Sequence, residues 1–415
     1  MPIRSLLLGF LVVTATSCAG PEPPTEPDEP PEVLRLALFN IEELRTVALN
    51  DVDDDGVGRN RQLRAAAEIV ARIAPDVLVV QEIDHDASAP DDPALNARRF
   101  ADAYLEPAAE RHGAPLAYPH AFAAPSNTGL ASGQDLDGDG EIVTEEGSRG
   151  YGGDSFGFGT YRGQYAMAVL SRFPLQADRL RSFQRFLWQD LPGHHIPPGF
   201  YSEQALEVFR LSSKSHWDLP VVVGEGLVHL LISHPTPPAF DGDEDRNGRR
   251  NFDEIKLWVE YLDGSSALID DNGRRGGKAH DEPFVVVGDL NARPDADGER
   301  YDGQTAIAQL LDHPALRDPS EILVSQGAEE HRREDRQSRG NSLEVAERAD
   351  SAALPRTATA EFLGGSRVDY LLPSLELRVL DGGVFWPASS EDPEGHALAA
   401  EASDHRLLWL DLALP

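Results

Sequence analysis

The sequence feature that most restricts the fold is a continuous apolar run that ends in a glycine and two polar residues, at residues 284–291. Three of its four apolar residues are valines, and a short run so rich in β-branched side chains is typical of a strand buried on both faces. Gly288 lets the chain turn, which leaves Asp289 and Asn291 at the carboxyl end of the strand, where α/β sheets usually carry their chemistry. A carboxylate and an amide two residues apart share one side and suit holding a water or an oxyanion beside a metal. The commoner alternative for such a motif is a plain turn.

Further apolar runs define the expected secondary structure. Alternating or continuous apolar residues predict strands at residues 33–41, 76–80, 166–172, 205–211, 221–223, 227–233, 284–287, 367–372 and 407–412. Apolar residues at helical spacing predict helices at residues 63–73, 95–112 with an interruption at Pro107, and 253–262. Helical connections come early and hairpin-like spacing comes later, so we expect an α/β fold with mixed sheets.

The charge of the chain restricts its partners. The formal net charge is −34, with 71 acidic residues against 37 basic ones. Such a surface repels polyanions unless cations intervene. The acidity is a solubility or salt adaptation, or it reflects clusters that hold divalent metals, and the two interpretations are compatible. With 40% hydrophobic residues the chain can still bury a large core and is globular.

The N-terminal segment has the pattern of an export signal. Residues 1–18 hold a basic residue, an apolar run too short to span a bilayer, and small residues that lead to Cys18. Cys18 is the single cysteine and stands where a bacterial lipobox places the acylated residue, although Ala15 occupies a position where leucine is usual, so ordinary cleavage is the alternative. Residues 19–32 are a Pro/Glu-rich linker. We expect one domain at 33–415 in an exported protein, either a cell-envelope lipoprotein or extracellular, that touches membrane only through a lipid anchor and needs no protein partner.

Polar residues that follow apolar runs recur through the chain. In order they are Asn40, Glu82, His234, Asp289 with Asn291, Asp369, and Asp404 with His405. Singly, each has a structural explanation, since a histidine at a strand end is more often a hydrogen-bonded surface residue. Together they include metal ligands, a base, an acid and an orienting carboxylate.

This ordered set resembles the endonuclease/exonuclease/phosphatase superfamily, the DNase I-like enzymes. The matching segments are residues 39–41, 81–82, 168–172, 233–234, 288–291, 367–370 and 403–405. The resemblance implies a four-layer α/β sandwich of two mixed β-sheets flanked by helices, and metal-dependent hydrolysis of a phosphoester.

The resemblance also implies a role for each matching residue. Glu82 would be the main ligand of Mg²⁺ or Mn²⁺, supported by Asn40 and Asp404, and oxygen ligands of this kind suit such cations. His405 would be the general base, held by Asp369. Three further residues complete the catalytic set: Asp289 and Asn291 would position the water and the phosphate, and His234 would stabilise or protonate the departing side.

Other residues stand where DNase I-like enzymes contact the substrate. Lys214, one of only three lysines, and His216 are candidate phosphate contacts, and the alternative is that they only accompany a packed Trp217. Tyr161, Arg162 and Asn251 are further candidates for substrate binding. Acidic insertions at residues 51–60, 125–164 and 241–254 exceed the superfamily's minimal pattern, and we expect them to shape the substrate cleft.

Two of these insertions have the oxygen-ligand spacing of calcium loops. The first places Asp135, Asp137 and Asp139 before a glycine, with Glu146 at the twelfth position, and the second repeats the pattern with Asp243, Asp245, Asn247 and Glu254. The alternative for both is an acid-rich surface turn. We expect at least the first loop to bind a structural Ca²⁺, separate from the catalytic metal.

Three functions follow as hypotheses. The leading one is an exported phosphodiesterase, with an extracellular nuclease as the main candidate, although the chain has no basic stripe for nucleic acid. The second, in the same fold, is a phosphatase or phospholipase-like enzyme on small or lipid phosphoesters. The third is a calcium-binding surface protein without catalysis, against which the intact catalytic set argues.

Overall fold

The computed structural model describes residues 32–113, 116–296, 300–338 and 356–415. The predicted signal segment and the linker up to residue 31 lie outside the described residues. Among the helices of the described ranges, none has the length and continuous apolarity of a bilayer-crossing segment.

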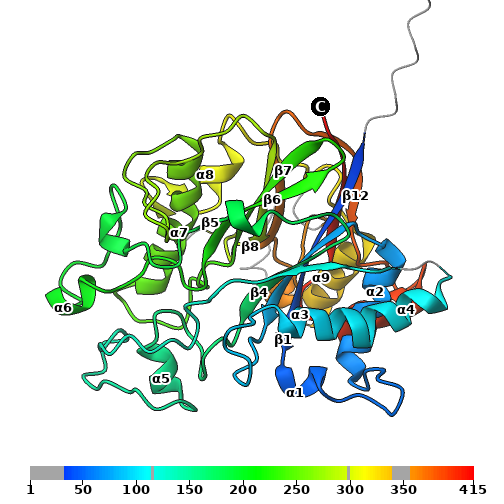
Figure 1. Cartoon of the computed structure of the whole chain (residues 1–415), viewed down its shortest axis with the longest axis horizontal. Helices are drawn as coiled ribbons and strands as arrows, with labels where there is room; N and C mark the ends of the chain where they lie inside the picture. Colours follow the sequence, from blue (N-terminus) through cyan, green and yellow to red (C-terminus); the bar gives the residue numbers. More distant parts are fainter. Residues whose placement is uncertain (1–31, 114–115, 297–299, 339–355) are drawn as a thin grey trace, which may run out of the picture. The chain divides into compact units, whose positions relative to one another are not determined.

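Two β-sheets form the centre of the described region (Figure 1). The first sheet contains, in spatial order, β12 (Arg378–Val384), β13 (Leu408–Ala413), β1 (Val33–Leu44), β2 (Val77–Ile83), β4 (Ala166–Ser171) and β3 (His120–Phe122). The second contains β11 (Asp369–Pro373), β8 (Phe284–Asp289), β7 (Gly226–Ser233), β6 (His216–Val223) and β5 (Arg181–Ser182). β1 runs parallel to β2 and β7 parallel to β8, while the remaining neighbours are antiparallel. A separate two-stranded sheet pairs β9 (Arg300–Tyr301) with β10 (Gln304–Thr305).

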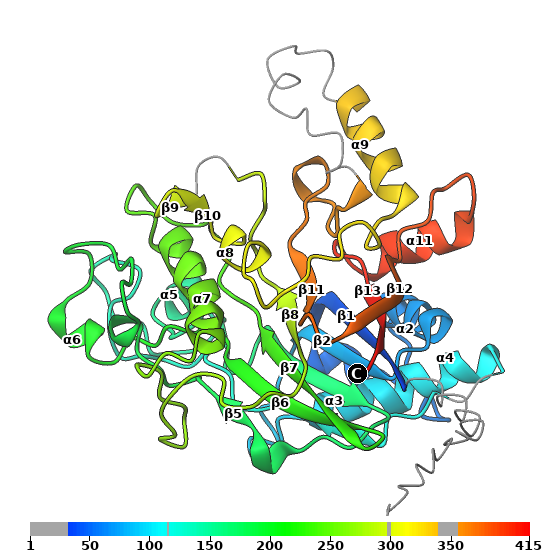
Figure 2. The same cartoon turned by 90° about the horizontal axis from the view of Figure 1, so that it is seen from above.

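Helices cover the outer face of each sheet, and Figure 2 shows the strands between the two helical layers. The first sheet packs against α2 (Arg61–Ile73), η1 (Ala101–Leu105), α4 (Glu106–Arg111) and α11 (Pro393–Ala402), and the second against α7 (Arg246–Leu262) and α8 (Ala308–Leu311). The other helical segments are α1 (Thr46–Leu49), α3 (Leu95–Phe100), α5 (Arg149–Gly153), α6 (Glu203–Leu206), α9 (Gln326–Ser338), η2 (Ala177–Arg179), η3 (Trp188–Asp190) and η5 (Phe362–Gly364). The predicted fold of two mixed sheets flanked by helices is therefore confirmed.

The alternation along β1 explains why the two sheets stack. Leu34 and Leu36 face the second sheet, whereas Ala37 and Phe39 face the helices, and all four are fully or almost fully buried. Successive strand residues point to opposite faces, so an apolar strand in this position supplies two cores at once.

The helix α2 begins and ends where the sequence indicates. The Asn60 side chain accepts a hydrogen bond from the Leu63 amide at 3.0 Å, which caps the first turn. At the other end Ala74 adopts a left-handed conformation with φ of 50°, directly before Pro75.

Three predicted elements differ from the structure. Residues 205–211 are not a strand: the first two lie in α6, and beyond it the pairing is limited to one isolated antiparallel bridge between Arg210 and Leu187, with Phe209 and Leu211 buried in the core. β6 begins at His216, earlier than predicted, because its polar inner residues hide the strand pattern. In the 95–112 helix the irregularity is the π-helical turn η1, and Pro107 follows it in α4 without interrupting the helical run.

Candidate active site

Polar residues from both sheets meet at one end of the sandwich. In the first sheet Asn40 is paired with Gln81 across the parallel β1 and β2, and in the second Asp369 is paired with Asp289 across β11 and β8. Asn40 Nδ2 joins the sheets, because it donates to Glu82 Oε1 at 3.2 Å and to Asp289 Oδ2 at 3.0 Å. The predicted strand ends therefore lie together.

Gln81 is a second link between the sheets, and sequence reasoning gave it no role of its own. Its fully buried amide donates to the Ser233 carbonyl at 2.9 Å and accepts from the Asp289 amide at 2.7 Å. The link fixes β7 and β8 at the residues that deliver His234 and Asp289. In the sequence, the signal for this role was Gln81 itself, a polar residue that ends an apolar run directly before Glu82.

Asp289 lies at the centre of the site. Its Oδ1 accepts from the Asn291 amide at 2.9 Å, and its Oδ2 lies 3.4 Å from His234 Nε2 and 3.8 Å from His405 Nε2. Burial raises the pKa of Asp289 to about 7. A carboxylate buried this deeply needs positive charge close by to remain ionised.

His405 is held in one orientation. Its Nδ1 lies 2.9 Å from Asp369 Oδ2, and its backbone amide donates to Ser403 Oγ at 3.0 Å. Burial would lower the pKa of His405, but the negative charges of Asp369 and Asp289 raise it to about 10. With Nδ1 engaged by Asp369, Nε2 is the nitrogen that faces the site.

Glu82 is presented by a strained backbone. Its φ is 64°, at a point where the pairing of β2 with β4 shifts register, and Asn291 has a φ of 50°. Left-handed backbone in residues other than glycine is costly and concentrates at functional sites. The bulge turns the Glu82 carboxylate toward Asn40.

Two groups of side chains at this end could hold a metal ion. In one, Glu82, His234 and Asp289 place ligand atoms within 4.8 Å of one another, and Asp289, Asp369 and His405 do so in the other. Within the described residues Asp404 belongs to neither group, and its Oδ1 lies 3.8 Å from His405 Nε2. The structure thus groups Glu82 with Asp289 and His234, and not with the predicted partner Asp404, among the described residues.

His234 and Lys214 bring two nitrogen groups to the same end. Burial, together with Lys214, lowers the pKa of His234 well below its usual value, so the ring is neutral, and its Nδ1 has no hydrogen-bond partner. Lys214 is 7% exposed, and its Nζ contacts the Pro235 carbonyl at 3.5 Å. Lys214 therefore keeps donor capacity, and its contact with a phosphate stays a prediction.

Two predicted substrate contacts are structural. His216 is fully buried, with Nδ1 2.8 Å from Ser212 Oγ and Nε2 2.8 Å from the Glu254 carbonyl, which leaves it no free nitrogen. Asn251 is 1% exposed and donates to the carbonyls of Thr236 and Leu290, both at 2.9 Å. Neither faces a substrate, because α7 packs over His216 and its own Asn251 lies on the buried side of the helix.

The other two predicted contacts lie nearer to the surface. The Tyr161 hydroxyl is 3.0 Å from both carboxylate oxygens of Asp84, whose pKa burial raises to about 6. Arg162 is exposed, and its backbone amide donates to Glu146 at 3.3 Å. Tyr161 is thus held by Asp84, two residues beyond Glu82 in the chain.

The two predicted calcium loops have different outcomes. Asp135, Asp137 and Asp139 lie within 4.8 Å of one another, whereas Glu146 is not part of that group. The second loop does not form.

α7 starts at Arg246, so Asn247 and Glu254 lie on a helix. The buried carboxylate of Glu254 accepts from the backbone amides of Ser213 and Thr236. The prediction of a second calcium loop, with Asp243 and Asp245, was wrong because helix formation separates its ligands.

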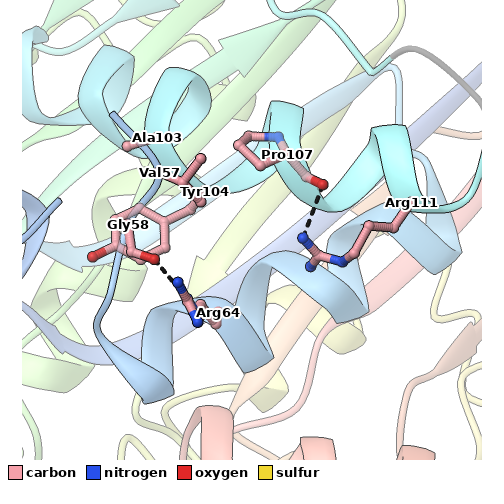
Figure 3. Close-up of a pocket in the computed structure, with 7 residues that line it drawn as sticks. All are labelled: Val57, Gly58, Arg64, Ala103, Tyr104, Pro107 and Arg111. Atoms are coloured by element: carbon pink, nitrogen blue, oxygen red, sulfur yellow. Dashed lines mark hydrogen bonds between the residues drawn. The ribbon is translucent and has the colours of Figure 1, made fainter. Parts of the chain in front are cut away.

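Two cavities differ in their chemistry. One of about 540 Å³ adjoins the site and is lined by Glu42, Glu43 and Asp404 among other residues. The other, of about 300 Å³, lies between α2 and η1–α4 (Figure 3). Its two charged groups are already engaged, Arg64 with the Gly58 carbonyl at 2.6 Å and Arg111 with the Pro107 carbonyl at 2.9 Å. Only the first cavity borders reactive groups.

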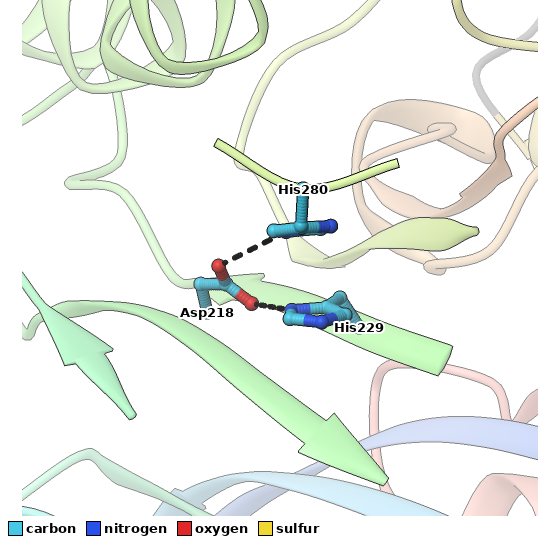
Figure 4. Close-up of side chains that lie close together, drawn as sticks. All are labelled: Asp218, His229 and His280. Atoms are coloured by element: carbon cyan, nitrogen blue, oxygen red, sulfur yellow. Dashed lines mark hydrogen bonds and ion pairs between the residues drawn. The ribbon is translucent and has the colours of Figure 1, made fainter. Parts of the chain in front are cut away.

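A further group of potential ligands lies on β6, β7 and the segment before β8 (Figure 4). Asp218 lies 2.5 Å from His229 Nδ1 and 3.5 Å from His280 Nε2, and the two rings stack with centroids 3.6 Å apart and 18° between their planes. Metal–nitrogen bonds of about 2.0–2.1 Å lie in the ring plane, and two nearly parallel rings cannot both direct a lone pair at one ion. As arranged, Asp218 is a carboxylate shared by two stacked imidazoles.

Comparisons with known proteins agree with this geometry. Residues 37–405 match the model of the Endonuclease/Exonuclease/phosphatase family. No curated protein matches the chain.

Similar solved structures cover nearly the same part of the chain. An endonuclease/exonuclease/phosphatase from Beutenbergia cavernae shares 19% identity over 92% of this chain and 72% of its own, with a TM-score of 0.47. A family protein from Leptotrichia buccalis shares 11% identity over 92% of this chain and 100% of its own, also with a TM-score of 0.47. The catalytic domain of human Nocturnin, with bound sulfate, shares 12% identity over 92% of this chain and 95% of its own, with a TM-score of 0.41.

Proposed function

Because the chain belongs to the endonuclease/exonuclease/phosphatase family, which its match over residues 37–405 shows, we propose that it is a divalent-metal-dependent enzyme that hydrolyses phosphodiester bonds. The observation that carries the proposal is the pairing of a buried histidine with two carboxylates. His405 Nδ1 is fixed by Asp369 at 2.9 Å while its Nε2 faces Asp289 at 3.8 Å. This is the arrangement of a general base beside a residue that positions a water.

The residues present fit a hard divalent cation. Glu82 and Asp289 offer oxygen ligands within 4.8 Å of each other, and the pKa of Asp289 is raised because burial leaves its charge uncompensated. Glu82 would hold Mg²⁺ or Mn²⁺, with Asn40, Asp289 and Asp404 around it. When bound, such a cation neutralises phosphate charge and stabilises the leaving oxygen.

The residues of the chain itself have separate roles in the proposed reaction. His405 takes a proton from the attacking water at Nε2, and Asp369 keeps the ring in the required tautomer. Asp289 and Asn291 orient the water and the phosphate, since the Asn291 amide and the Asp289 carboxylate form one turn. Neutral His234 offers a hydrogen bond to the departing side.

A more specific proposal is that the enzyme is an exported nuclease, which one observation supports and another opposes. The N-terminal pattern supports export, whereas the net charge of −34 opposes a polyanionic substrate. The second candidate is a small or lipid phosphoester, which the acidic wall formed by Glu42, Glu43 and Asp404 beside the site would repel less than a nucleic acid.

The experiment is a parallel assay on bis-p-nitrophenyl phosphate, p-nitrophenyl phosphate and plasmid DNA, with Mg²⁺, Mn²⁺ or Ca²⁺ and with EDTA. We expect hydrolysis of the diester that EDTA abolishes. His405→Ala and Asp289→Ala should each lower kcat by about 10²–10⁴-fold, the usual contribution of a positioned base.

Thermal melting of each variant separates loss of chemistry from loss of fold. Wild-type activity in either variant would remove that residue from the mechanism. Absence of hydrolysis on all three substrates would favour a calcium-binding protein without catalysis.

A further inference from the structure

The helix α7 presents one buried carboxylate to the back of the site. Glu254 is fully buried, and its Oε1 accepts from the Ser213 amide at 2.6 Å while its Oε2 accepts from the Thr236 amide at 2.7 Å. Both carboxylate oxygens are therefore used on backbone amides of two different loops.

These two loops carry site residues. Ser213 precedes Lys214, and Thr236 lies two residues beyond His234. The loops also contact each other directly, because Ser213 Oγ donates to the His234 carbonyl at 3.1 Å. A single carboxylate thus fixes the distance between the segments that deliver Lys214 and His234.

The same helix face reaches a third segment. Asn251, one turn before Glu254, donates to the carbonyls of Thr236 and Leu290, each at 2.9 Å. Leu290 stands between Asp289 and Asn291, so α7 ties the positions of all these groups to one rigid element.

The ammonium of Lys214 depends on nearby negative charge. Lys214 is 7% exposed, and the one described hydrogen bond of its Nζ, to the Pro235 carbonyl, is 3.5 Å long. Burial lowers the pKa of Lys214, and the carboxylates of Glu254, Glu82 and Asp289 oppose that shift. An ammonium has three donors, so Lys214 retains N–H groups for a phosphate oxygen.

We propose that Glu254 is a positioning residue of the active site, which acts through Lys214 by holding its loop in register with His234. Lys214 in turn donates to a phosphate oxygen of the substrate. The proposal rests on the proposed phosphodiesterase function.

Glu254→Gln is the direct test, because it keeps the size of the side chain but replaces one accepting oxygen with an NH₂ group. One of the two loop amides then loses its acceptor, and misplacement of a site group by about 1 Å lowers the rate by about 10²-fold. We expect kcat on bis-p-nitrophenyl phosphate to fall by about that factor, while KM changes little.

Asp253→Asn is the matched control. Asp253 precedes Glu254 on the same helix, is equally buried, and bonds to Trp188 Nε1 at 2.6 Å and His195 Nδ1 at 2.7 Å, away from the site. It should lower the melting temperature about as much as Glu254→Gln but keep wild-type kcat. Equal kcat values in the two variants would overturn the proposal.

A double-mutant cycle with Lys214→Met tests whether Glu254 acts through Lys214. If it does, the double variant is no slower than Lys214→Met alone, because the interaction is already lost. Losses that multiply would show that Glu254 acts independently and would overturn this step. An inactive wild-type enzyme would instead refute the proposed function, so the two failures are distinguishable.

Discussion

The charges around His405 determine the pH at which it can accept a proton. Burial favours the neutral ring, but Asp369 and Asp289 outweigh it and raise the pKa of His405 to about 10. A bound cation would reduce the contribution of Asp289, whereas Asp369 bonds to the far nitrogen and keeps its influence.

Asp369→Asn should therefore move the acid limb of the pH profile of kcat/KM to lower pH. The base must be unprotonated, activity is lost as pH falls through its pKa, and removal of the Asp369 charge lowers that pKa. The plateau should also fall, by about 10²–10⁴-fold, because the tautomer is no longer fixed. The measurement is kcat/KM against pH with bis-p-nitrophenyl phosphate at saturating Mg²⁺, and an acid limb at the wild-type pH would contradict the assignment.

For individual residues, the resemblance to the family was sufficient to bring the main candidates together. It implied that Asn40, Glu82, Asp289, Asp369 and His405 share one site, and they do meet although they come from two different sheets. The roles proposed for them remain predictions.

His216 and Asn251 could not be placed correctly, because their burial depends on α7, which lies across the second sheet and whose start was predicted seven residues late. Glu254 has the spacing of a calcium ligand in the sequence but serves as an acceptor for two loops. A local sequence pattern does not show which residues a helix elsewhere in the chain will cover.

Among the elements, the loop at residues 135–143 is organised by a buried carboxylate. Asp154, 2% exposed, accepts from the Leu136 amide at 2.9 Å and from the Val143 amide at 2.7 Å. These two hydrogen bonds hold the ends of the loop together. The ligand atoms of Asp135, Asp137 and Asp139 lie within 4.8 Å of one another. Burial and the neighbouring carboxylates raise the pKa of Asp137, so a cation among them would relieve repulsion.

Calcium should raise the melting temperature of a Glu82→Gln variant, whose catalytic site is impaired, and Asp137→Ala in that background should remove the gain. The physical reason is that Ca²⁺ binds the folded loop and not the unfolded chain. Asp243→Ala is the control, since its loop is not formed and the calcium response should persist. Melting curves of the Glu82→Gln variant that are indifferent to calcium would refute a calcium site here.

The same contrast shows which elements a sequence can specify. The helix α2 was predictable because an apolar stripe at helical spacing ends directly before Pro75. The segment at residues 205–211 was misjudged as a strand, because it begins within α6 and its pairing is limited to one isolated antiparallel bridge between Arg210 and Leu187. The spacing of apolar residues indicates which side chains are buried, whereas the pairing of strands depends on which other segments the fold places alongside.

The whole molecule carries a charge that should govern its choice of substrate. With a net charge of −34, the enzyme and a polyanion repel each other, and salt screens that repulsion. We expect kcat/KM on plasmid DNA to rise with NaCl while kcat/KM on bis-p-nitrophenyl phosphate stays nearly constant. A nuclease with a basic binding surface shows the opposite slope, so a decrease on DNA would argue for a cationic groove.

Export remains a proposal about the segment before residue 32. If Cys18 is acylated, Cys18→Ser should shift the protein from the membrane fraction to the soluble fraction of the producing bacterium. Wild-type protein in the soluble fraction would instead indicate ordinary cleavage. Activity per molecule should be the same in both forms, because Cys18 lies outside the described domain.

The pairing of β1 with β13 has a consequence for the time at which activity first arises. β13 lies between β1 and β12, and its register joins Val33 to Ala413, so the first sheet is incomplete until the chain has been synthesised through residue 413. Asn40 and His405 come from opposite ends of the domain, and contacts so distant in sequence form late. A nascent chain on the ribosome therefore has neither His405 nor a complete first sheet, and we expect the proposed activity to arise only after synthesis of the chain has reached residue 413.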